Sequence, residues 1–324
     1  MSSQNSKKIY SKMRSGYILV ITITLLSLAV VIVTRLANDS ILNQSYVVNS
    51  FKRLKAQQLA FSGIDFGRSI IALKEDDQKK VKQFKQILIN LNRWQKYEFE
   101  QDGSKNMVKF YLSSEQGKCN INKCLKFGED KAKGIKLEPN ILQIMADPLG
   151  KILNEQDLKS SLEDWSTKRI IPLNDTTDLL KFEKFAYFKD RVFIDQKMEY
   201  ALDDLFTTFT NESLVQPYLL SNSLAKLLKL KNINDYDLEE WKELVNKAAD
   251  NFSDNINLDK NWDKLFAPMF GKKISELQPN LLKTFSTKWD PKIFSIIVHA
   301  QHENVFYSIY AIISAEKIYR LYFI

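Results

Sequence analysis

The segment MRSGYILVITITLLSLAVVIVTR, residues 13–35, has a composition that no ordinary soluble domain needs. About twenty residues between Arg14 and Arg35 carry no charge. At a helical rise of about 1.5 Å per residue, such a run crosses a hydrocarbon core about 30 Å thick. A removable secretory signal has a shorter apolar region that ends in small residues, whereas this one continues to Val33. The segment is therefore predicted to span a membrane.

The charges in front of the span predict its orientation. Residues 1–16 contain Lys7, Lys8, Lys12 and Arg14, and they contain no acidic residue. Positive charge beside a span stays on the cytoplasmic side. We therefore expect the N-terminus in the cytoplasm and the rest of the chain on the other side.

The net charge of the chain, +8, does not indicate a nucleic-acid partner. Four of the 47 basic residues lie in residues 1–16, and the remaining 43 are set against 39 acidic residues. This small excess on a surface of mixed sign is too weak for a phosphate-binding stripe. With 44% hydrophobic and 12% aromatic residues, the exported part is expected to bury a core.

The apolar pattern continues beyond the span. No proline occurs between residues 17 and 74, and apolar residues recur at steps close to three and four. One long helix is predicted, with Gly63 or Gly67 as the position of any break. The recurring residues are Leu36, Ile41, Leu42, Tyr46, Val47, Phe51, Leu54, Leu59, Phe61, Ile64, Ile70 and Ile71.

The remaining patterns predict an α+β fold with a small mixed sheet. A helix is predicted over 76–93, and a period of two predicts a hairpin over 97–112 with its turn at Asp102 and Gly103. Short helices follow, then a polar loop around residue 255 and two or three C-terminal strands. The predicted parts are a leader (1–16), a transmembrane helix (17–38), its continuation (39–74), the first part of an α+β domain (75–137), an inserted, mostly helical domain (138–285) and strands that return to the sheet (286–324).

A basic leader ending in glycine, KKIYSKMRSG (7–16), followed at once by YILVITITLLSLAVVIV (17–33), is similar to the N-terminus of type IV pilins and type II secretion pseudopilins. The resemblance implies that a prepilin peptidase cuts between Gly16 and Tyr17 and that the new N-terminal residue is methylated. Members commonly carry a glutamate five residues after the cut, which pairs with the terminal amine of a neighbouring subunit. Here that residue is Ile21.

In lacking this glutamate, the sequence resembles the general secretion pathway protein K family, whose members are large minor pseudopilins. A subunit at the fibre tip has no subunit above it, so a buried carboxylate there would be an unpaired cost. Four further stretches are similar to segments of this family: LAFSGIDFGRSI (59–70), VKFYLSSEQGKCNINKC (108–124), LKSSLEDW (158–165) and LDDLFTTFT (202–210).

The resemblance implies a non-catalytic minor pseudopilin of a type II secretion system. It would cap the pseudopilus tip, help initiate pseudopilus assembly for protein export, and carry a SAM-like inserted domain. The implied partners are other minor pseudopilins, the major pseudopilin, the prepilin peptidase and the inner membrane. The implied location is the bacterial inner membrane, crossed once, with the C-terminal domain in the periplasm.

Candidate chemistry in the sequence is sparse. His299 and His302, beside Glu303, could ligate a metal on a helix. Their surroundings alternate as a strand, in which residues three apart face opposite sides. No Ser/His/Asp set, Gly-rich phosphate loop or pair of catalytic carboxylates stands out, so we do not expect an enzyme.

Two possible sites remain open at this stage. Asn255, Asn257, Asp259 and Asn261 have the alternate spacing that calcium ligands can use, and tip pseudopilins of the family can bind calcium in their helical domain. The alternative is a plain polar loop, because the glycine and terminal glutamate of a regular calcium loop are missing.

The two cysteines, Cys119 and Cys124, could close a small disulfide loop in an oxidising compartment, or they could be buried thiols. With no histidine nearby, they do not predict a zinc site.

The alternative function is an unprocessed, signal-anchored periplasmic binding or sensor module. About sixteen residues on the cytoplasmic side leave no output domain for a sensor. Cleavage at Gly16 distinguishes the two functions, because an ordinary anchor keeps its leader.

Overall fold

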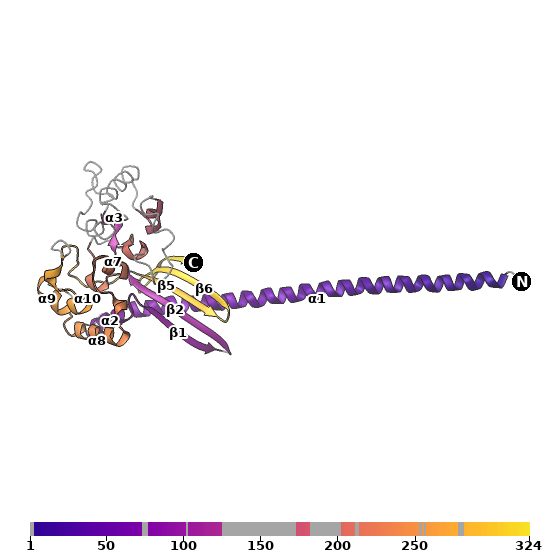
Figure 1. Ribbon diagram of the computed structural model, residues 1–324, viewed down its shortest axis with the longest axis horizontal. Coiled ribbons are helices and arrows are strands. Elements are labelled where there is room, and N and C mark those ends of the chain that lie inside the picture. The colour runs from indigo at the N-terminus through magenta and orange to yellow at the C-terminus, as the bar shows by residue number, and fades with distance from the viewer. Residues whose placement is uncertain are drawn as a thin grey trace. The chain divides into compact units, whose positions relative to one another are not determined.

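The structure is a computed structural model of the chain, shown in Figure 1. It describes residues 3–72, 77–101, 103–124, 173–181, 202–210, 214–252, 255, 257–277 and 282–324. Much of the expected inserted domain, including LKSSLEDW (158–165), lies outside the described residues. The chain forms two compact units, Met1–Ala56 and Gln57–Ile324, which are described separately.

The predicted long helix is present as α1 (Ser3–Ile71), and it ends three residues before the predicted limit. It contains no break at Gly63 or Gly67. These glycines serve close packing, because a Cβ atom added to Gly63 would lie 2.6 Å from Cγ1 of Val298. A Cβ atom on Gly67 would meet Ile296 more closely still. At two successive turns, the backbone of the helix therefore packs directly against side chains of the sheet.

Five antiparallel strands form the main sheet, in the order β1-β2-β5-β6-β7. The predicted hairpin corresponds to the first two, and its turn has Gly103 in the left-handed region at φ 73°. The mixed sheet we expected is wrong for this layer, since all its strands pair antiparallel. Two described strands, β3 and β4, pair in parallel, in a separate two-stranded sheet. The strands are β1 (Trp94–Gln101), β2 (Ser104–Ser114), β3 (Cys119–Asn120), β4 (Phe206–Thr207), β5 (Phe294–His302), β6 (Val305–Ile313) and β7 (Ile318–Phe323).

Alternate residues of the central strands build the core against α1. Ala60 and Ile64 of the helix are fully buried there. Burial on one face of an antiparallel sheet produces the period of two seen in the sequence. The buried strand residues are Val108, Phe110, Leu112, Ile296, Val298, Ala300, Ile309, Ala311 and Ile313.

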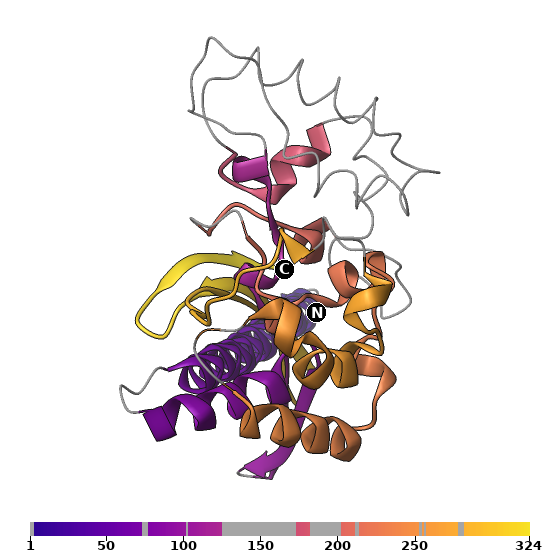
Figure 2. The ribbon, with the colours of Figure 1, turned by 90° about the vertical axis from the view of Figure 1, so that its left-hand side faces the viewer.

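The described helices after α1 lie before β1 and between β2 and β5. The predicted helix over 76–93 is α2 (Asp77–Asn90), and Figure 2 shows it beside α8. Its Phe84 enters an aromatic cluster with Tyr218, Phe252 and Trp289. The other described helices are η1 (Glu115–Gly117), α3 (Ile121–Cys124), η2 (Thr176–Lys181), α6 (Leu202–Leu205), η4 (Pro217–Leu219), α7 (Asn222–Leu227), η5 (Ile233–Asp235), α8 (Leu238–Asp250), α9 (Leu258–Leu265), α10 (Ala267–Phe270) and η6 (Ile274–Glu276).

The polar stretch around residue 255 is not a loop throughout, because α9 begins at Leu258. The side chain of Asn257 caps this helix by accepting a hydrogen bond of 3.1 Å from the backbone N–H of Lys260. Leu258, Trp262 and Leu265 are then buried along one face. The expectation of a loop was wrong because it followed the polar residues, which are the majority, whereas the three apolar residues decide the packing.

Candidate functional site

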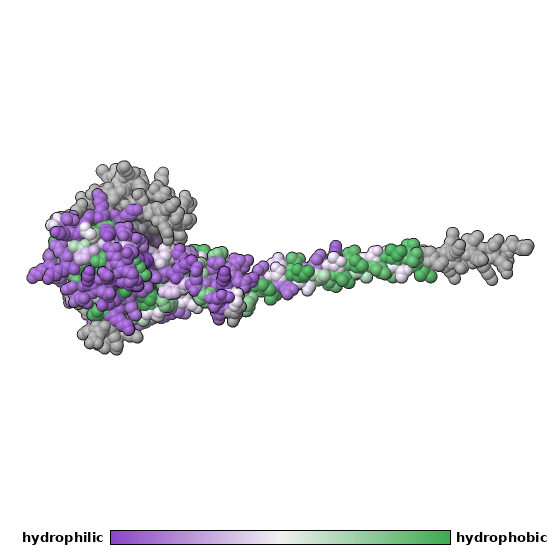
Figure 3. Space-filling model, turned by 60° about the horizontal axis from the view of Figure 1, so that its bottom comes forward, coloured by the Kyte–Doolittle hydropathy of each residue, from purple (hydrophilic) through white to green (hydrophobic). Residues whose placement is uncertain are grey.

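The first candidate site is the apolar surface of α1. Within the described part of the chain, one helix, from Tyr17 onward, is long and apolar enough to cross a membrane. Figure 3 shows its exposed residues coloured mostly as hydrophobic. Tyr17 is 71% exposed and Ile21 is 43% exposed. A continuous apolar surface of this kind needs lipid or another protein to cover it.

The polar side chains of this segment are satisfied within the helix itself. The hydroxyls of Thr24, Ser27 and Thr34 each donate to a backbone carbonyl four residues earlier, at 2.8 Å, and Thr22 does the same. Such bonds keep these four hydroxyl donors paired in a medium without water. The segment is thus compatible with lipid on every side.

The processing residues lie inside this helix. The backbone is helical through Gly16 and Tyr17, and Ile21 follows one turn later. Cleavage after Gly16 and the role of Ile21 at a fibre tip stay predictions.

The second candidate site is the segment Glu115–Asn122, which joins the sheet to the helical region. Lys118 donates from Nζ to Oε1 of Glu115 at 2.5 Å and to Oγ of Ser295 at 2.8 Å. The hydroxyl of Thr207 donates to the other oxygen of Glu115. Both charged side chains are almost fully buried. This buried ion pair and its hydrogen bonds to Ser295 and Thr207 hold the start of the segment, β5 and β4 in one arrangement.

Gly117 allows a backbone approach that no other residue would permit. A Cβ atom there would overlap the carbonyl of Leu219. The backbone N–H of Gln216 donates to the carbonyl of Gln116 at 2.8 Å, and that of Ser221 to Gly117 at 3.2 Å. The glycine therefore lets the residues on either side of η4 hydrogen-bond directly to η1.

The two asparagines of this segment each attach another part of the chain. Asn122 accepts from the backbone N–H of Leu173 at 2.8 Å and donates to its carbonyl at 2.9 Å. Asn120 donates to the hydroxyl of Thr210 at 3.0 Å. The motif that resembles the pseudopilin family is thus a structural junction in this chain.

The cysteines flank this junction. Cys119 is buried in β3, and Cys124 is the last residue of α3. Whether they form a disulfide stays a prediction.

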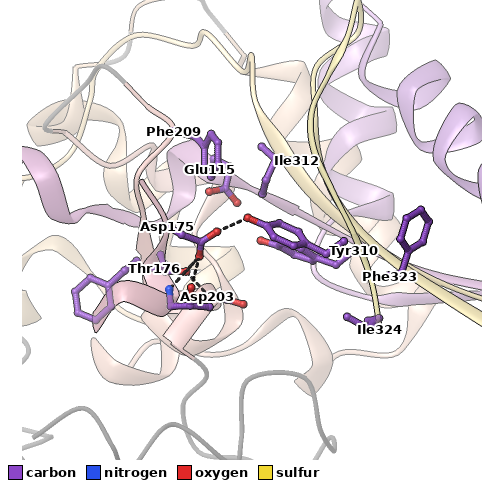
Figure 4. A pocket seen from close by; sticks show the side chains of 12 residues that line it. Glu115, Asp175, Thr176, Asp203, Phe209, Tyr310, Ile312, Phe323 and Ile324 are labelled. Atoms are coloured by element: carbon purple, nitrogen blue, oxygen red, sulfur yellow. Dashed lines mark hydrogen bonds between the residues drawn. The ribbon is translucent and has the colours of Figure 1, made fainter. Parts of the chain in front are cut away.

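A cavity of about 180 Å³ lies between β6, β7, η2 and α6. Figure 4 shows Glu115, Asp175 and Asp203 around it, with the ring of Tyr310. Burial raises the pKa of Asp203 to about 6, and a hydrogen bond from Thr176 opposes that rise. Three carboxylates thus share a small, partly apolar space.

Asp175 has stronger partners than Asp203. Burial alone would raise the pKa of Asp175, but hydrogen bonds from Tyr322 and Thr177 and the charge of Arg320 hold it below its ordinary value. The guanidinium of Arg320 lies 2.7 Å from Oδ2 of Asp175. This pair ties β7 to the start of η2. No local pattern in the sequence predicts this pair, because its two residues lie 145 positions apart.

The histidines of β5 face opposite sides of the strand, as predicted. His302 is buried and lies 2.7 Å through Nδ1 from Oδ1 of Asn106. His299 lies 2.8 Å through Nδ1 from the hydroxyl of Ser308 and stacks on Trp94. Among the described residues, no group of three His, Cys, Asp or Glu could hold a metal ion.

The candidate calcium residues are spread over two structural contexts. Asn255 forms an isolated bridge with Lys288, and Asn257 caps α9. Asp259 and Asn261 stand two positions apart within α9, a spacing that does not place side chains on one helix face. Calcium binding by these residues stays a prediction.

Among solved structures, the chain is similar to a component of a secretion complex. This component is a chain in the crystal structure of the GspK–GspI–GspJ complex from the type 2 secretion system of enterotoxigenic Escherichia coli. The TM-score is 0.43 and the identity 10%, over 84% of this chain and 99% of that chain. No protein-family model and no curated protein sequence matches the chain. With so low a TM-score, the function has to be argued from the residues of the chain itself.

Proposed function

We propose that this protein is a pseudopilin, and more narrowly a minor pseudopilin that caps a type II secretion pseudopilus. The observation that carries the proposal is one helix, α1, that is apolar and exposed directly after the Gly16–Tyr17 junction and whose last turns pack into an antiparallel sheet. A pseudopilin needs both features in one helix, because the same element is the anchor and the fibre-forming surface.

An exposed apolar helix can serve two environments in turn. In lipid, its side chains contact acyl chains, and its hydroxyls are already bonded to its own carbonyls. In a fibre made of similar helices, the same side chains pack against neighbouring subunits by van der Waals contact. Moving from membrane to fibre therefore exposes no new polar group.

The glycine contacts would connect the helix firmly to the exported domain. The helix backbone lies against the side chains of Val298 and Ile296 at Gly63 and Gly67. Arg68, one residue further, donates to the backbone carbonyl of Glu316 at 2.8 Å and to that of Ala315 at 3.2 Å. A force applied along α1 would thus reach the sheet without passing through a flexible linker.

Ile21 supports the position at the tip. An acidic residue at this point in a packed helix is stable only when a neighbouring subunit supplies a positive partner. The isoleucine needs no such partner, so the chain suits the last position of a fibre. The domain after Ala56 would then cap the end and would bind the other minor pseudopilins below it.

The proposal includes the maturation and location of the chain. A prepilin peptidase would cut after Gly16 and the amine of Tyr17 would be methylated. The chain would sit in the inner membrane of a bacterium with residues 1–16 in the cytoplasm and the C-terminal domain in the periplasm. It would act by assembly and recognition, with no bond made or broken by its own side chains.

The test is the mass and N-terminal sequence of the full chain, expressed with a prepilin peptidase and extracted from membranes. We expect the mature chain to begin at Tyr17, with or without a methyl group. A Gly16→Val variant should keep residues 1–16, whereas the neighbouring Ser15→Ala variant should be cut normally. If all three chains keep the leader, the proposal is wrong and the protein is an anchored periplasmic binding module.

The tip position needs its own measurement. Antibodies against the exported domain, labelled with gold, should mark one end of isolated pseudopili. Labels distributed along the fibre would instead identify a subunit of the shaft.

A further inference from the structure

The two edge strands of the main sheet are protected very differently. β1 carries Lys96, Glu98 and Glu100 exposed along its length, with an ion pair of 2.5 Å between Lys96 and Glu98. Charged side chains on an edge hinder pairing with another strand. β1 also exposes Tyr97 at 46% and Phe99 at 41% between these charges. β7, at the other edge, exposes Ile318 at 39%, Tyr319 at 41% and Phe323 at 60%, and it has one charged residue, Arg320, within its length.

The one cation within β7 does not protect its edge. Arg320 is held by Asp175 at 2.7 Å and by the hydroxyl of Tyr322 at 3.0 Å. Its guanidinium also lies 4.9 Å from the centre of the Phe209 ring. The charge is thus turned to the cavity and is neutralised there. The strand keeps an apolar edge with no charge directed outward from its centre.

The hydrogen-bond pattern shows which backbone groups of β7 face outward. The N–H of Ile324 donates to the carbonyl of Ser308 at 3.2 Å, toward β6. Phe323 is opposite Ile309 in the register, and Leu321 is opposite Ala311. In an antiparallel ladder the direction of the backbone groups alternates with each residue. The N–H and C=O groups of Leu321 and Phe323 therefore point away from β6, and no described strand lies beyond them.

The two ends of this edge differ in charge. Lys317 stands exposed just before the strand. At the other end, Phe323 and Ile324 line the cavity that holds the carboxylates of Glu115, Asp175 and Asp203. Two of these carboxylates have cationic partners, Lys118 and Arg320. Asp203, whose carboxylate accepts a hydrogen bond from the hydroxyl of Thr176, leaves this end negative.

We infer that β7 binds an extended segment of a partner protein, which adds a sixth strand to the sheet. The segment would have apolar residues at alternate positions, to cover Leu321 and Phe323. A basic residue would lie at the end beside Ile324, where the charge is negative. Backbone bonds would supply the affinity, and the alternate side chains and the terminal cation the specificity. The inference goes beyond the proposed function and does not depend on cleavage at Gly16.

The test uses the full chain in detergent and a synthetic peptide as the probe. The peptide alternates valine and threonine, has blocked termini and carries one lysine at an end. Amide hydrogen exchange, resolved to single residues, should show fast exchange at Leu321 and Phe323 in the free protein. Both amides should become protected when the peptide binds. If both are already protected without it, the edge is covered by the chain itself and the inference is wrong.

Two variants separate strand addition from simple apolar contact. Phe323→Pro removes an outward N–H and spares the bonds to β6, so it should weaken peptide binding at least tenfold. Phe323→Ala keeps the N–H and loses the ring, so it should weaken binding only a few-fold. Equal losses in both variants would show that the backbone edge is not used.

The charge preference is tested with a peptide that has glutamate in place of lysine, which should bind more weakly at low salt. Equal binding of the two peptides would overturn the basic partner. Self-association of the chain that the peptide does not compete away would show that the edge pairs with a second copy instead.

Discussion

Replacing Lys118 by methionine should destabilise the domain after Ala56 by about 3–5 kcal/mol. Lys118 is 3% exposed, and its ammonium group is bonded to Glu115 at 2.5 Å and to Ser295 at 2.8 Å. The variant leaves the carboxylate of Glu115 buried without its cation. A buried charge that loses its partner costs more than the pair itself contributes, which sets this magnitude.

The double variant Glu115→Gln with Lys118→Met is the matched control. It removes both charges, and the glutamine can still accept the hydrogen bond from Thr207. We expect it to recover at least about 1–2 kcal/mol relative to the single variant, since no unpaired charge remains.

Thermal unfolding of the full chain in detergent, followed by tryptophan fluorescence, measures both effects. For a domain of this size, about 3 kcal/mol corresponds to a fall of about 6–12 °C in the midpoint. A double variant that is as unstable as the single one, or less stable, would refute the reasoning. The junction would then depend on the shape of the lysine side chain and not on its charge.

Gly63→Leu should prevent close packing of α1 on β5 and should therefore lower the unfolding midpoint. Ser62→Leu, on the exposed side of the helix, should leave the midpoint unchanged. Equal midpoints of the two variants would contradict the packing argument. Asp203→Asn should stabilise the protein by about 2–3 kcal/mol at pH 8 and hardly at all near pH 4. The pKa of Asp203 is about 6 in the fold, above its ordinary 3.8, so the folded state favours the neutral acid. The stability that the wild type gains from this neutral acid is lost as the pH rises through 6, and asparagine does not lose it. Unfolding profiles at a series of pH values check this, and a constant difference would refute it. Calcium should raise the midpoint of the wild type but not of Asp259→Ala, if the polar stretch binds it; identical shifts would exclude this site. A disulfide between Cys119 and Cys124 would lower the intact mass by about 2 Da relative to the reduced chain, whereas two thiols would react with an alkylating reagent after denaturation.

Local sequence patterns predicted the elements that depend only on neighbouring residues. The apolar helix after Gly16, long enough to cross a membrane, follows from its length and lack of charge. Its continuation to Ile71 follows from its spacing and the lack of proline. The hairpin follows from a period of two. The C-terminal strands, predicted as two or three and present as three, follow from β-branched and aromatic residues. These properties are determined residue by residue, so they can be predicted before any contact is known.

Other features were decided only when distant segments met. The pairing of β2 with β5 joins residues almost two hundred positions apart, and it makes the sheet antiparallel where a mixed one was expected. Gly63 predicted a possible break, but contact with Val298 makes it a packing position inside an unbroken helix. The bond from Arg320 to Asp175, which leaves the edge of β7 unprotected, also has no local signal.

The physical reason is the range of the interactions. Hydrophobic periodicity and helix capping act over a few residues, whereas sheet pairing, buried ion pairs and close backbone contacts depend on which surfaces come together. The sequence alone therefore determined that the chain has a long apolar helix leading into an α+β domain. Only the tertiary structure decided which residues form the junction at Lys118 and which edge of the sheet is open to a partner.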